Sequence, residues 1–191
     1  AIGSGRGRVL DLCAAPGGKT LQLAAQGWDV IAVDQSESRL ARLRENLART
    51  ELAAEVVGAD ILRWEPDRQA DAVLIDAPCS ATGIFRRHPD VLHRAHPRFV
   101  AEMAELQARI LRRAADWVKP GGALVYATCS LEPEEGERQA EAFLAGDSRF
   151  ATDPAAHDGR ILPSSFRGGC DGFFIARFRR NASLVGAFGA A

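Results

Sequence analysis

Two cysteines stand in short motifs that each follow an apolar run, and their side chains are suited to nucleophilic chemistry. Cys79 lies in Ile-Asp-Ala-Pro-Cys-Ser-Ala-Thr-Gly and Cys129 lies in Tyr-Ala-Thr-Cys-Ser. The preceding runs, residues 72–75 and 123–126, have the length and composition of buried strands. Ligands of open α/β sheets bind beyond the carboxyl ends of the strands, so both thiols are expected beside one cleft. Because a thiolate is a strong nucleophile, the pair indicates covalent chemistry with separate roles for attack and release.

Simple packing is the competing interpretation, since an uncharged thiol behaves as a small hydrophobic side chain. For either cysteine alone this interpretation is favoured. Their joint placement after two strands favours an active site, because Asp76 precedes one thiol by three residues and Thr128 directly precedes the other. Cys170 has no motif around it and is interpreted as structural or incidental.

A glycine turn after the first expected strand is a second candidate binding element. It reads Cys-Ala-Ala-Pro-Gly-Gly-Lys-Thr and leads into a helix. Adjacent glycines let the backbone approach a ligand, and the helix start offers free N–H donors. The turn is neither GxGxxG nor a P-loop, because the upstream glycine of those motifs is absent. Asp34 ends the second expected strand, where a carboxylate can accept hydrogen bonds from ribose hydroxyls, so a nucleoside cofactor is predicted; a plain turn residue is the alternative.

The distribution of charge along the chain is more informative about binding partners than the net charge. The net charge is −1, with 47% hydrophobic and 26% charged residues, which is ordinary for a globular protein. Residues 86–113, however, carry seven arginines against three acidic residues, a local net charge of +4. Segment 86–98 follows the Cys79 motif and is predicted to contact phosphate, whereas residues 98–113 fit a solvated helix face equally well. The predicted phosphate contacts are Arg86, Arg87, Arg94 and Arg98.

Alternating apolar strands and amphipathic helices predict an α/β fold with a doubly wound, mostly parallel seven-stranded sheet and an antiparallel edge strand. Strands are expected at 8–13, 30–33, 55–57, 71–75 and 123–128, with two closing strands near Phe150 and 172–178. Helices are expected after the glycine turn, after a Ser36 cap, at 98–117, and from Pro133 to about Leu144. Residues 119–122 are expected to end the helix at 98–117, and residues 154–171 are expected to form a connecting loop. The predicted organisation is a flexible lead-in at 1–7, a catalytic domain at 8–180 and a tail at 181–191.

Several classes of protein are disfavoured. No apolar run approaches the roughly 20 residues that span a bilayer, and residues 1–8 hold no signal-peptide core. Four cysteines without a CxxC pair disfavour structural zinc and a disulfide scaffold, so a cytoplasmic protein is predicted. His88, His93 and His96 lie close in sequence, but their spacing matches no standard metal site and no metal is predicted. The three tryptophans are expected to pack in the core: Trp28, Trp64 and Trp117.

Together these motifs resemble the RNA cytosine-5 methyltransferases of the Nol/Nop/Sun type. The resemblance rests on Val-Leu-Asp-Leu-Cys-Ala-Ala-Pro-Gly-Gly-Lys-Thr and on the two cysteine motifs, in this order. Arg-Arg-His-Pro-Asp at 86–90 and Asp-Gly-Phe-Phe at 171–174 are similar to the bacterial 16S ribosomal RNA branch, called the Sun or Fmu type. The resemblance covers residues 8–180. It implies a Rossmann-like class I methyltransferase fold, S-adenosylmethionine as cofactor, and cytosine C5 in single-stranded or melted RNA, in particular 16S ribosomal RNA, as substrate.

The resemblance also implies roles for single residues. Cys129 would attack cytosine C6, Cys79 would assist release, and Asp76 would contact the N3 and amino edge of the base. Within the cofactor site, Asp34 would lie toward the ribose, Asp60 near the adenine and Asp76 at the methionine end. The full set implied for the cofactor is Cys13, Ala14, Ala15, Pro16, Gly17, Gly18, Lys19, Asp34, Asp60 and Asp76. Lys19 is also a candidate for lowering the pKa of a nearby thiol.

Two other interpretations remain open at this point. In a DNA cytosine-5 methyltransferase the Pro-Cys thiol itself attacks, but the second motif, Thr-Cys-Ser, is not expected there. A nucleotide-binding scaffold without turnover would use the same fold, although the presence of both cysteines and Asp76 argues against it. Family members usually carry RNA-binding sequence before the catalytic domain, so weak RNA binding by this chain alone is expected, with a separate region or partner adding affinity.

Overall fold

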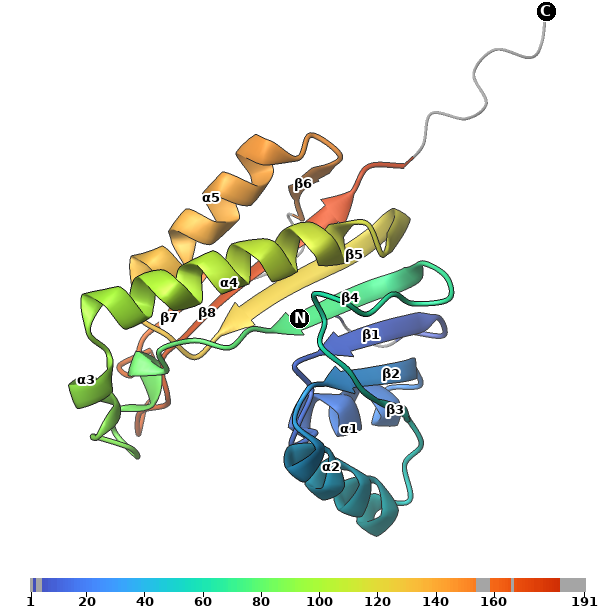
Figure 1. Cartoon of the computed structure of the whole chain (residues 1–191), viewed down its shortest axis with the longest axis horizontal. Coiled ribbons are helices and arrows are strands. Elements are labelled where there is room, and N and C mark those ends of the chain that lie inside the picture. The colour runs from blue at the N-terminus through green and yellow to red at the C-terminus, as the bar shows by residue number, and fades with distance from the viewer. Residues whose placement is uncertain (1, 3–4, 154–158, 166, 183–191) are drawn as a thin grey trace, which may run out of the picture.

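A central sheet with helices on both of its faces forms the molecule (Figure 1). The computed structural model describes residues 2, 5–153, 159–165 and 167–182. In chain order the strands and helices, with η for short 3-10 helices, are β1 (Arg8–Leu12), α1 (Gly18–Ala25), β2 (Asp29–Asp34), α2 (Glu37–Thr50), β3 (Glu55–Gly58), β4 (Ala70–Asp76), η1 (Thr82–Ile84), α3 (Val91–Arg94), α4 (Pro97–Ala115), β5 (Val118–Thr128), η2 (Pro133–Glu135), α5 (Glu137–Gly146), β6 (Phe150–Thr152), β7 (Gly159–Ile161) and β8 (Phe173–Arg180).

The strand order changes direction at β1. Along the sheet the order is β3-β2-β1-β4-β5-β8-β6, and β7 also pairs with β8. Strands β1 to β5 run parallel, whereas β8 pairs antiparallel with β5. Open sheets of this kind bind ligands beyond the carboxyl ends of the strands at such a switch point. The ends of β1, β2, β4 and β5 are therefore the edge at which a site is expected.

Successive side chains along a strand point to opposite faces of the sheet, so they pack against different layers of helices. Leu10 faces one side and joins a buried cluster that includes Phe143 of α5 and residues of α4. Val9 faces the other side and packs with Leu23 of α1, while α2 contributes Leu43 to a third cluster. Burial on both faces explains why the central strands are almost uniformly apolar.

The tryptophan prediction is confirmed. Trp64 and Trp117 meet edge to face with ring centroids 5.3 Å apart, and Trp117 is buried. Trp28 packs against the cluster on the opposite face of the sheet. Gly5 lies so close to the Trp28 ring that a Cβ at this position would clash with it.

The region between α4 and β5 differs from the prediction. The helix ends at Ala115 and not at residue 117, and residues 119–122 lie inside β5. Val118 pairs with Ala70, and the register then shifts before Ala123 pairs with Ala72. The Lys-Pro-Gly-Gly segment thus forms an irregularity in the ladder, which a search for continuous apolar runs does not recognise as strand.

The beginnings of three helices also differ in detail. Ser36 stands at the start of α2, but its side chain makes no capping hydrogen bond; its N–H donates to Asp34 Oδ1 at 2.9 Å. Pro133 opens the 3-10 turn η2, and α5 proper begins four residues later. His96 Nδ1 accepts the Phe99 N–H at 3.1 Å and caps α4, a role that sequence analysis did not assign.

The sheet of the described residues has eight strands, one more than predicted. The additional strand is β7, which lies within the segment predicted as a connecting loop at 154–171. β6 and β7 pair with successive parts of β8, so they occupy one edge end to end. A strand of three residues has too little apolar pattern to be found from sequence. Residues 183–191 of the predicted tail at 181–191, together with parts of the lead-in and of the 154–171 loop, lie outside the described residues.

Candidate active site

The two motif cysteines lie side by side. β4 and β5 are neighbours, and Asp76 is level with Ala127 in the ladder, so the segments that follow emerge at the same edge. Cys79 Sγ and Cys129 Sγ are 3.5 Å apart, within hydrogen-bond distance for sulfur. Both thiols are free and partly buried. The structure therefore brings together the two side chains that the sequence placed after separate strands.

The two thiols have opposite acid–base tendencies. The pKa of the Cys79 thiol is raised. The hydrogen bond between the two thiols is the largest cause, and burial and the charge of Cys129 raise this pKa further. The hydrogen bond from Cys79 lowers the pKa of the Cys129 thiol, against burial and the Asp76 charge. Cys129 therefore ionises first, and once it is a thiolate only the Cys79 S–H can donate between the two sulfurs. Lys19 also lowers the pKa of Cys129, as the smallest of the causes.

A cavity of about 470 Å³ opens beside the thiols. Its lining combines carboxylates with apolar side chains, and it reaches from the end of β2 to the ends of β4 and β5. The lining residues are Cys13, Asp34, Gln35, Arg39, Ala59, Asp60, Ile61, Leu62, Asp76, Ala77, Pro78, Cys79, Ala81, Leu106, Ile110 and Cys129. Four of the ten residues predicted to hold a cofactor are in this lining: Cys13, Asp34, Asp60 and Asp76.

The remaining predicted cofactor residues form the turn behind this cavity. Gly17 has a φ of 105°, in the left-handed region that favours glycine. Ala14, Ala15 and Gly17 are buried, whereas Pro16 and Gly18 are exposed. None of the turn residues after Cys13 belongs to the described cavity lining.

Asp34 holds the turn in place. Its Oδ2 accepts the Ala15 N–H at 3.1 Å and its Oδ1 accepts the Ser36 N–H at 2.9 Å. Arg39 Nη1 lies 3.3 Å from the same Oδ2, and the carboxylate is only 2% exposed. Two backbone donors and one guanidinium thus satisfy much of the hydrogen-bonding capacity of this carboxylate, which gives Asp34 a structural task beside its place in the cavity wall.

A buried carboxyl lies under the same turn. Asp11 Oδ2 accepts the Thr20 hydroxyl at 2.6 Å, while its Oδ1 has no hydrogen-bond partner among the described residues. Burial, more than the nearby charges, raises the pKa of Asp11 to about 7. Lys19 and Asp76 are close enough to act on it in opposite directions.

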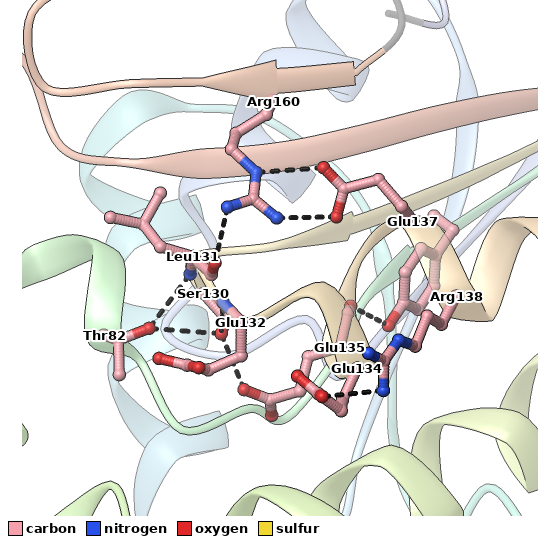
Figure 2. Close-up of polar contacts among 10 residues, drawn as sticks. Thr82, Ser130, Leu131, Glu132, Glu134, Glu135, Glu137, Arg138 and Arg160 are labelled. Atoms are coloured by element: carbon pink, nitrogen blue, oxygen red, sulfur yellow. Dashed lines mark hydrogen bonds and ion pairs between the residues drawn. The ribbon is translucent and has the colours of Figure 1, made fainter.

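Sequence analysis missed a buried polar network behind the thiols. Glu135 is fully buried and accepts hydrogen bonds from Ser80, Gln107 and Ser130. Figure 2 shows the hydrogen bonds that join Ser130 to Thr82 and to Glu135, and all three residues are buried. The run Glu-Pro-Glu-Glu-Gly-Glu at 132–137 fits favourable charges at a helix start, and nothing in it marks which glutamate is buried.

A second missed contact anchors the segment after Cys129. Arg160 of β7 donates to the Leu131 carbonyl at 2.7 Å and forms two hydrogen bonds with Glu137 (Figure 2). These bonds raise the pKa of Arg160 and lower that of Glu137. The residue lies in the predicted connecting loop, so its partner across the molecule could not be assigned from sequence.

Three loops meet in close backbone contact beside the thiols. The Gly83 N–H donates to the Cys129 carbonyl at 2.9 Å, and the Gly172 N–H donates to the Gly83 carbonyl at 2.7 Å. A Cβ on Gly83 would clash with the Gly172 carbonyl and lie 2.8 Å from the Cys129 carbonyl oxygen. The Asp-Gly-Phe-Phe motif at 171–174 thereby reaches the site although it belongs to the far end of the chain.

The four predicted phosphate contacts differ in their surroundings. Arg87 forms an ion pair with Asp171, Arg94 lies 3.0 Å from Asp90, and Arg98 lies 2.8 Å from Glu102. Arg86 is exposed and has no ion-pair partner among the described residues. A second cavity of about 480 Å³ lies between Cys79 and α3. Its lining residues are Cys79, Ser80, Ala81, His93, Arg94, His96 and Phe99.

Within the part of the chain that the structure describes, no group of three or more histidines, cysteines or acidic residues is arranged to hold a metal ion. No helix among the described residues is long and apolar enough to cross a membrane.

Comparison with known proteins gives a consistent answer. A family model described as 16S rRNA methyltransferase RsmB/F matches residues 4–179. The chain is 47% identical over 186 residues to ribosomal RNA small subunit methyltransferase B of Klebsiella pneumoniae strain 342, covering 91% of this chain and 42% of that protein. The corresponding protein of Vibrio cholerae is 46% identical over 176 residues, covering 88% of this chain and 40% of that protein.

Solved structures confirm the predicted fold class. The crystal structure of PH0851 has a TM-score of 0.86 at 31% identity, covering 94% of this chain and 44% of that one. The structure of NSun6 from Pyrococcus horikoshii with SFG has a TM-score of 0.81 at 28% identity, covering 91% and 48%. The chain spans less than half the length of each of these proteins. The matching motifs, the fold and the family model together show that the chain belongs to the 16S rRNA methyltransferase RsmB/F family.

Proposed function

We propose that this chain carries the catalytic centre for S-adenosylmethionine-dependent methylation of cytosine C5 in 16S ribosomal RNA. The observation that supports this most strongly is the pair of thiols 3.5 Å apart, of which Cys129 is the more acidic. Membership of an rRNA methyltransferase family supports the substrate class. An aromatic carbon such as cytosine C5 needs covalent activation, and a thiolate beside the base can supply it.

The cavity beside the thiols fits a nucleoside cofactor with a cationic end. Asp34 and Asp60 line one part and Asp76 lines the part next to the thiols, while Ile61 and Ile110 add apolar wall. Carboxylates can accept hydrogen bonds from ribose and amino groups, and apolar walls suit an adenine ring. We assign the holding of S-adenosylmethionine to this cavity, with the turn at 13–19 behind it. When bound, this cofactor supplies an electrophilic methyl group.

Cys129 begins the reaction. Its thiolate adds to C6 of cytosine, a C–S bond forms, and the electron pair of the C5–C6 double bond makes C5 nucleophilic. Asp76 ends β4 within the same cavity lining as Cys129, where its carboxyl group can hydrogen-bond the N3 and amino edge of the ring and stabilise the adduct.

Cys79 completes the reaction. While Cys129 is a thiolate, the hydrogen bond and the negative charge of that sulfur raise the pKa of Cys79. Formation of the C–S bond removes both, so Cys79 can then lose its proton to solvent. Once C5 carries the methyl group in addition to its hydrogen, the Cys79 thiolate takes the C5 proton, the C5–C6 double bond forms again, and the C–S bond breaks with its electron pair returning to Cys129.

The RNA would approach from the side of α3. The second cavity reaches Cys79 and is lined by His96 and Phe99, whose rings can stack on a base, and by Arg94. A target base must leave any stack to reach the thiols. We propose Arg86, Arg87, Arg94 and Arg98 as phosphate contacts around this entrance.

Methyl transfer with single cysteine variants tests the proposal. Labelled S-adenosylmethionine and unmodified 16S ribosomal RNA are incubated with the native chain, Cys129→Ala, Cys79→Ala and, as control, Cys170→Ala. We expect label on cytosine C5 with the native chain and the control, none with Cys129→Ala, and a trapped protein–RNA adduct with Cys79→Ala. If only Cys79→Ala prevents the adduct, the roles are reversed, as in the DNA enzymes. If S-adenosylmethionine binds but no RNA is methylated, the chain is a binding scaffold.

RNA affinity and compartment belong to the same proposal. We propose that a separate region or partner adds RNA affinity and that the activity is cytoplasmic, where the four free cysteines stay reduced. A gel-shift titration tests the first point. Weak binding by this chain alone is expected, and tight sequence-selective binding would contradict it.

A further inference from the structure

Glu135 contacts both residues that directly follow the two cysteines. Its Oε1 accepts the Ser80 N–H at 2.8 Å, and its Oε2 accepts the Ser130 hydroxyl at 2.6 Å. The Ser80 hydroxyl also donates to Oε2, and the two serine oxygens are 3.2 Å apart. One carboxylate thus joins the segment after β4 to the segment after β5.

The burial of Glu135 makes this link informative. The residue is 0% exposed, and it has no ion-pair partner among the described residues. Burying a carboxylate away from water is costly unless hydrogen-bond donors replace its hydration. Here the donors are neutral, and two of the three residues that supply them, Ser80 and Ser130, adjoin the thiols. Packing alone does not require a charged group at this position.

Other elements hold the carboxylate itself. Gln107 of α4 donates through Nε2 to Glu135 Oε1 at 3.0 Å and to the Pro78 carbonyl at 2.8 Å. The Tyr126 hydroxyl lies 2.7 Å from the Glu135 carbonyl oxygen and 3.0 Å from Gln107 Oε1. Contacts from α4 and β5 therefore fix both the side chain and the backbone of Glu135. A group fixed from several sides can in turn fix its neighbours.

We propose that Glu135 is the positioning residue for the thiol pair: it binds the serines that follow Cys79 and Cys129 and so holds the two sulfurs in contact. The catalytic consequence rests on the proposed function, whereas the effect on the thiols themselves does not. Glu135 touches neither sulfur and positions them through Ser80 and Ser130, while its charge also raises the pKa of the Cys79 thiol as the smallest of the causes. Loss of the link lets the segments separate, and Cys129 loses the hydrogen bond that favours its thiolate.

The experiment compares Glu135→Ala and Glu135→Gln with the control Glu134→Gln. Glu134 is the neighbouring residue, and its side chain pairs with Arg138 at 2.8 Å near the surface. Two thiol measurements use the free chain. The first follows alkylation of each cysteine against pH by peptide mass spectrometry. The second follows formation of the Cys79–Cys129 disulfide with diamide, which is reduced to the hydrazine as the two thiols lose their hydrogens.

For Glu135→Ala we expect the pH midpoint of Cys129 alkylation to rise by about one unit. Disulfide formation should slow by roughly tenfold or more, because the sulfurs no longer start in contact. In the methylation assay kcat should fall by roughly 10²-fold with little change in the KM for S-adenosylmethionine. Glu135→Gln keeps an acceptor for Ser80 and should recover part of each effect, whereas the control should match the native chain.

A purely structural role gives a different result. If Glu135→Ala only lowers the melting temperature and leaves the alkylation midpoint and the disulfide rate unchanged, the proposal is wrong. If that variant does not fold, Ser130→Ala removes one of the donors, and smaller shifts in the same directions are expected. The absence of any shift in Ser130→Ala would overturn the proposal. An inactive native chain would contradict the proposed function alone, because both thiol measurements are independent of methyl transfer.

Discussion

Lys19 Nζ lies 2.6 Å from Asp76 Oδ2 and joins the glycine turn after β1 to the end of β4. The side chains are 40% and 38% exposed, so the pair lies near the surface rather than in the core. Their charges act in opposite directions on Cys129: Asp76 raises the pKa of this thiol and Lys19 lowers it. The pair therefore tunes the acidity of the Cys129 thiol, the nucleophile of the proposed reaction.

Replacement of Lys19 should make the Cys129 thiol less acidic. In Lys19→Met the Asp76 charge is no longer offset, so the pKa of Cys129 rises and its alkylation midpoint moves to higher pH. Methyl transfer near neutral pH should fall by roughly tenfold, because Asp76 also loses the partner that orients it. The matched control is Lys119→Met, which breaks a similar pair with Asp71 at 2.8 Å and similar exposure, away from the thiols. Equal alkylation profiles for both variants would exclude a role of Lys19 at the thiol.

Addition of one methyl group at Gly83 should disrupt the crossing of the three loops. In Gly83→Ala the new Cβ clashes with the Gly172 carbonyl and crowds the Cys129 carbonyl. We expect a loss of stability of about 1–3 kcal/mol and a fall in methyl transfer of roughly 10²-fold, since the Cys129 segment must shift. Thermal unfolding and kcat measure the two effects. Gly146→Ala at the end of α5, where a Cβ meets no atom within 4 Å, is the control and should keep full activity.

Asp11 should make the stability of the chain depend on pH. Burial raises its pKa from 3.8 to about 7, so the folded state favours the protonated acid. The stability that this group contributes is complete below its unfolded pKa and is lost as pH rises to about 7, with a slope of at most about 1.4 kcal/mol per unit. Asp11→Asn cannot ionise and should lack this loss. Urea unfolding of both proteins at about pH 5 and about pH 8 measures this loss of stability. Equal changes in the free energy of unfolding for the native chain and the variant would show that Asp11 does not titrate in this range.

Arg86 and Arg87 should differ in RNA binding although they are adjacent. The guanidinium of Arg87 is held by two oxygens of Asp171, whereas Arg86 is exposed and has no ion-pair partner among the described residues. Loss of one phosphate contact to a single strand lowers the salt dependence of log K by about 0.7. We expect this change for Arg86→Ala and a smaller one for Arg87→Ala, with the exposed Arg42→Ala as control. A larger change for Arg87→Ala would show that RNA displaces Asp171.

The predictability of each part of the site depended on whether its residues carry a distinctive sequence pattern. Cys79 and Cys129 were predicted to meet because parallel strands end at a common edge, and this rule needs only the strand positions. β7 was missed because three residues carry too little pattern. The burial of Glu135 was missed because acidic residues near a helix start are favourable on a solvent-exposed surface as well.

The sequence by itself determined the α/β alternation, the edge of the sheet that carries the site and the cysteines that occupy it, because these follow from local periodicity and from motifs of adjacent residues. Only the tertiary structure decided the chemical difference between the thiols. That difference depends on a sulfur–sulfur contact of 3.5 Å between residues 50 positions apart. It depends also on burial and on charges from other elements, such as Asp76 and Lys19. Electrostatic effects fall off with distance in space, and that distance is set by the packed fold.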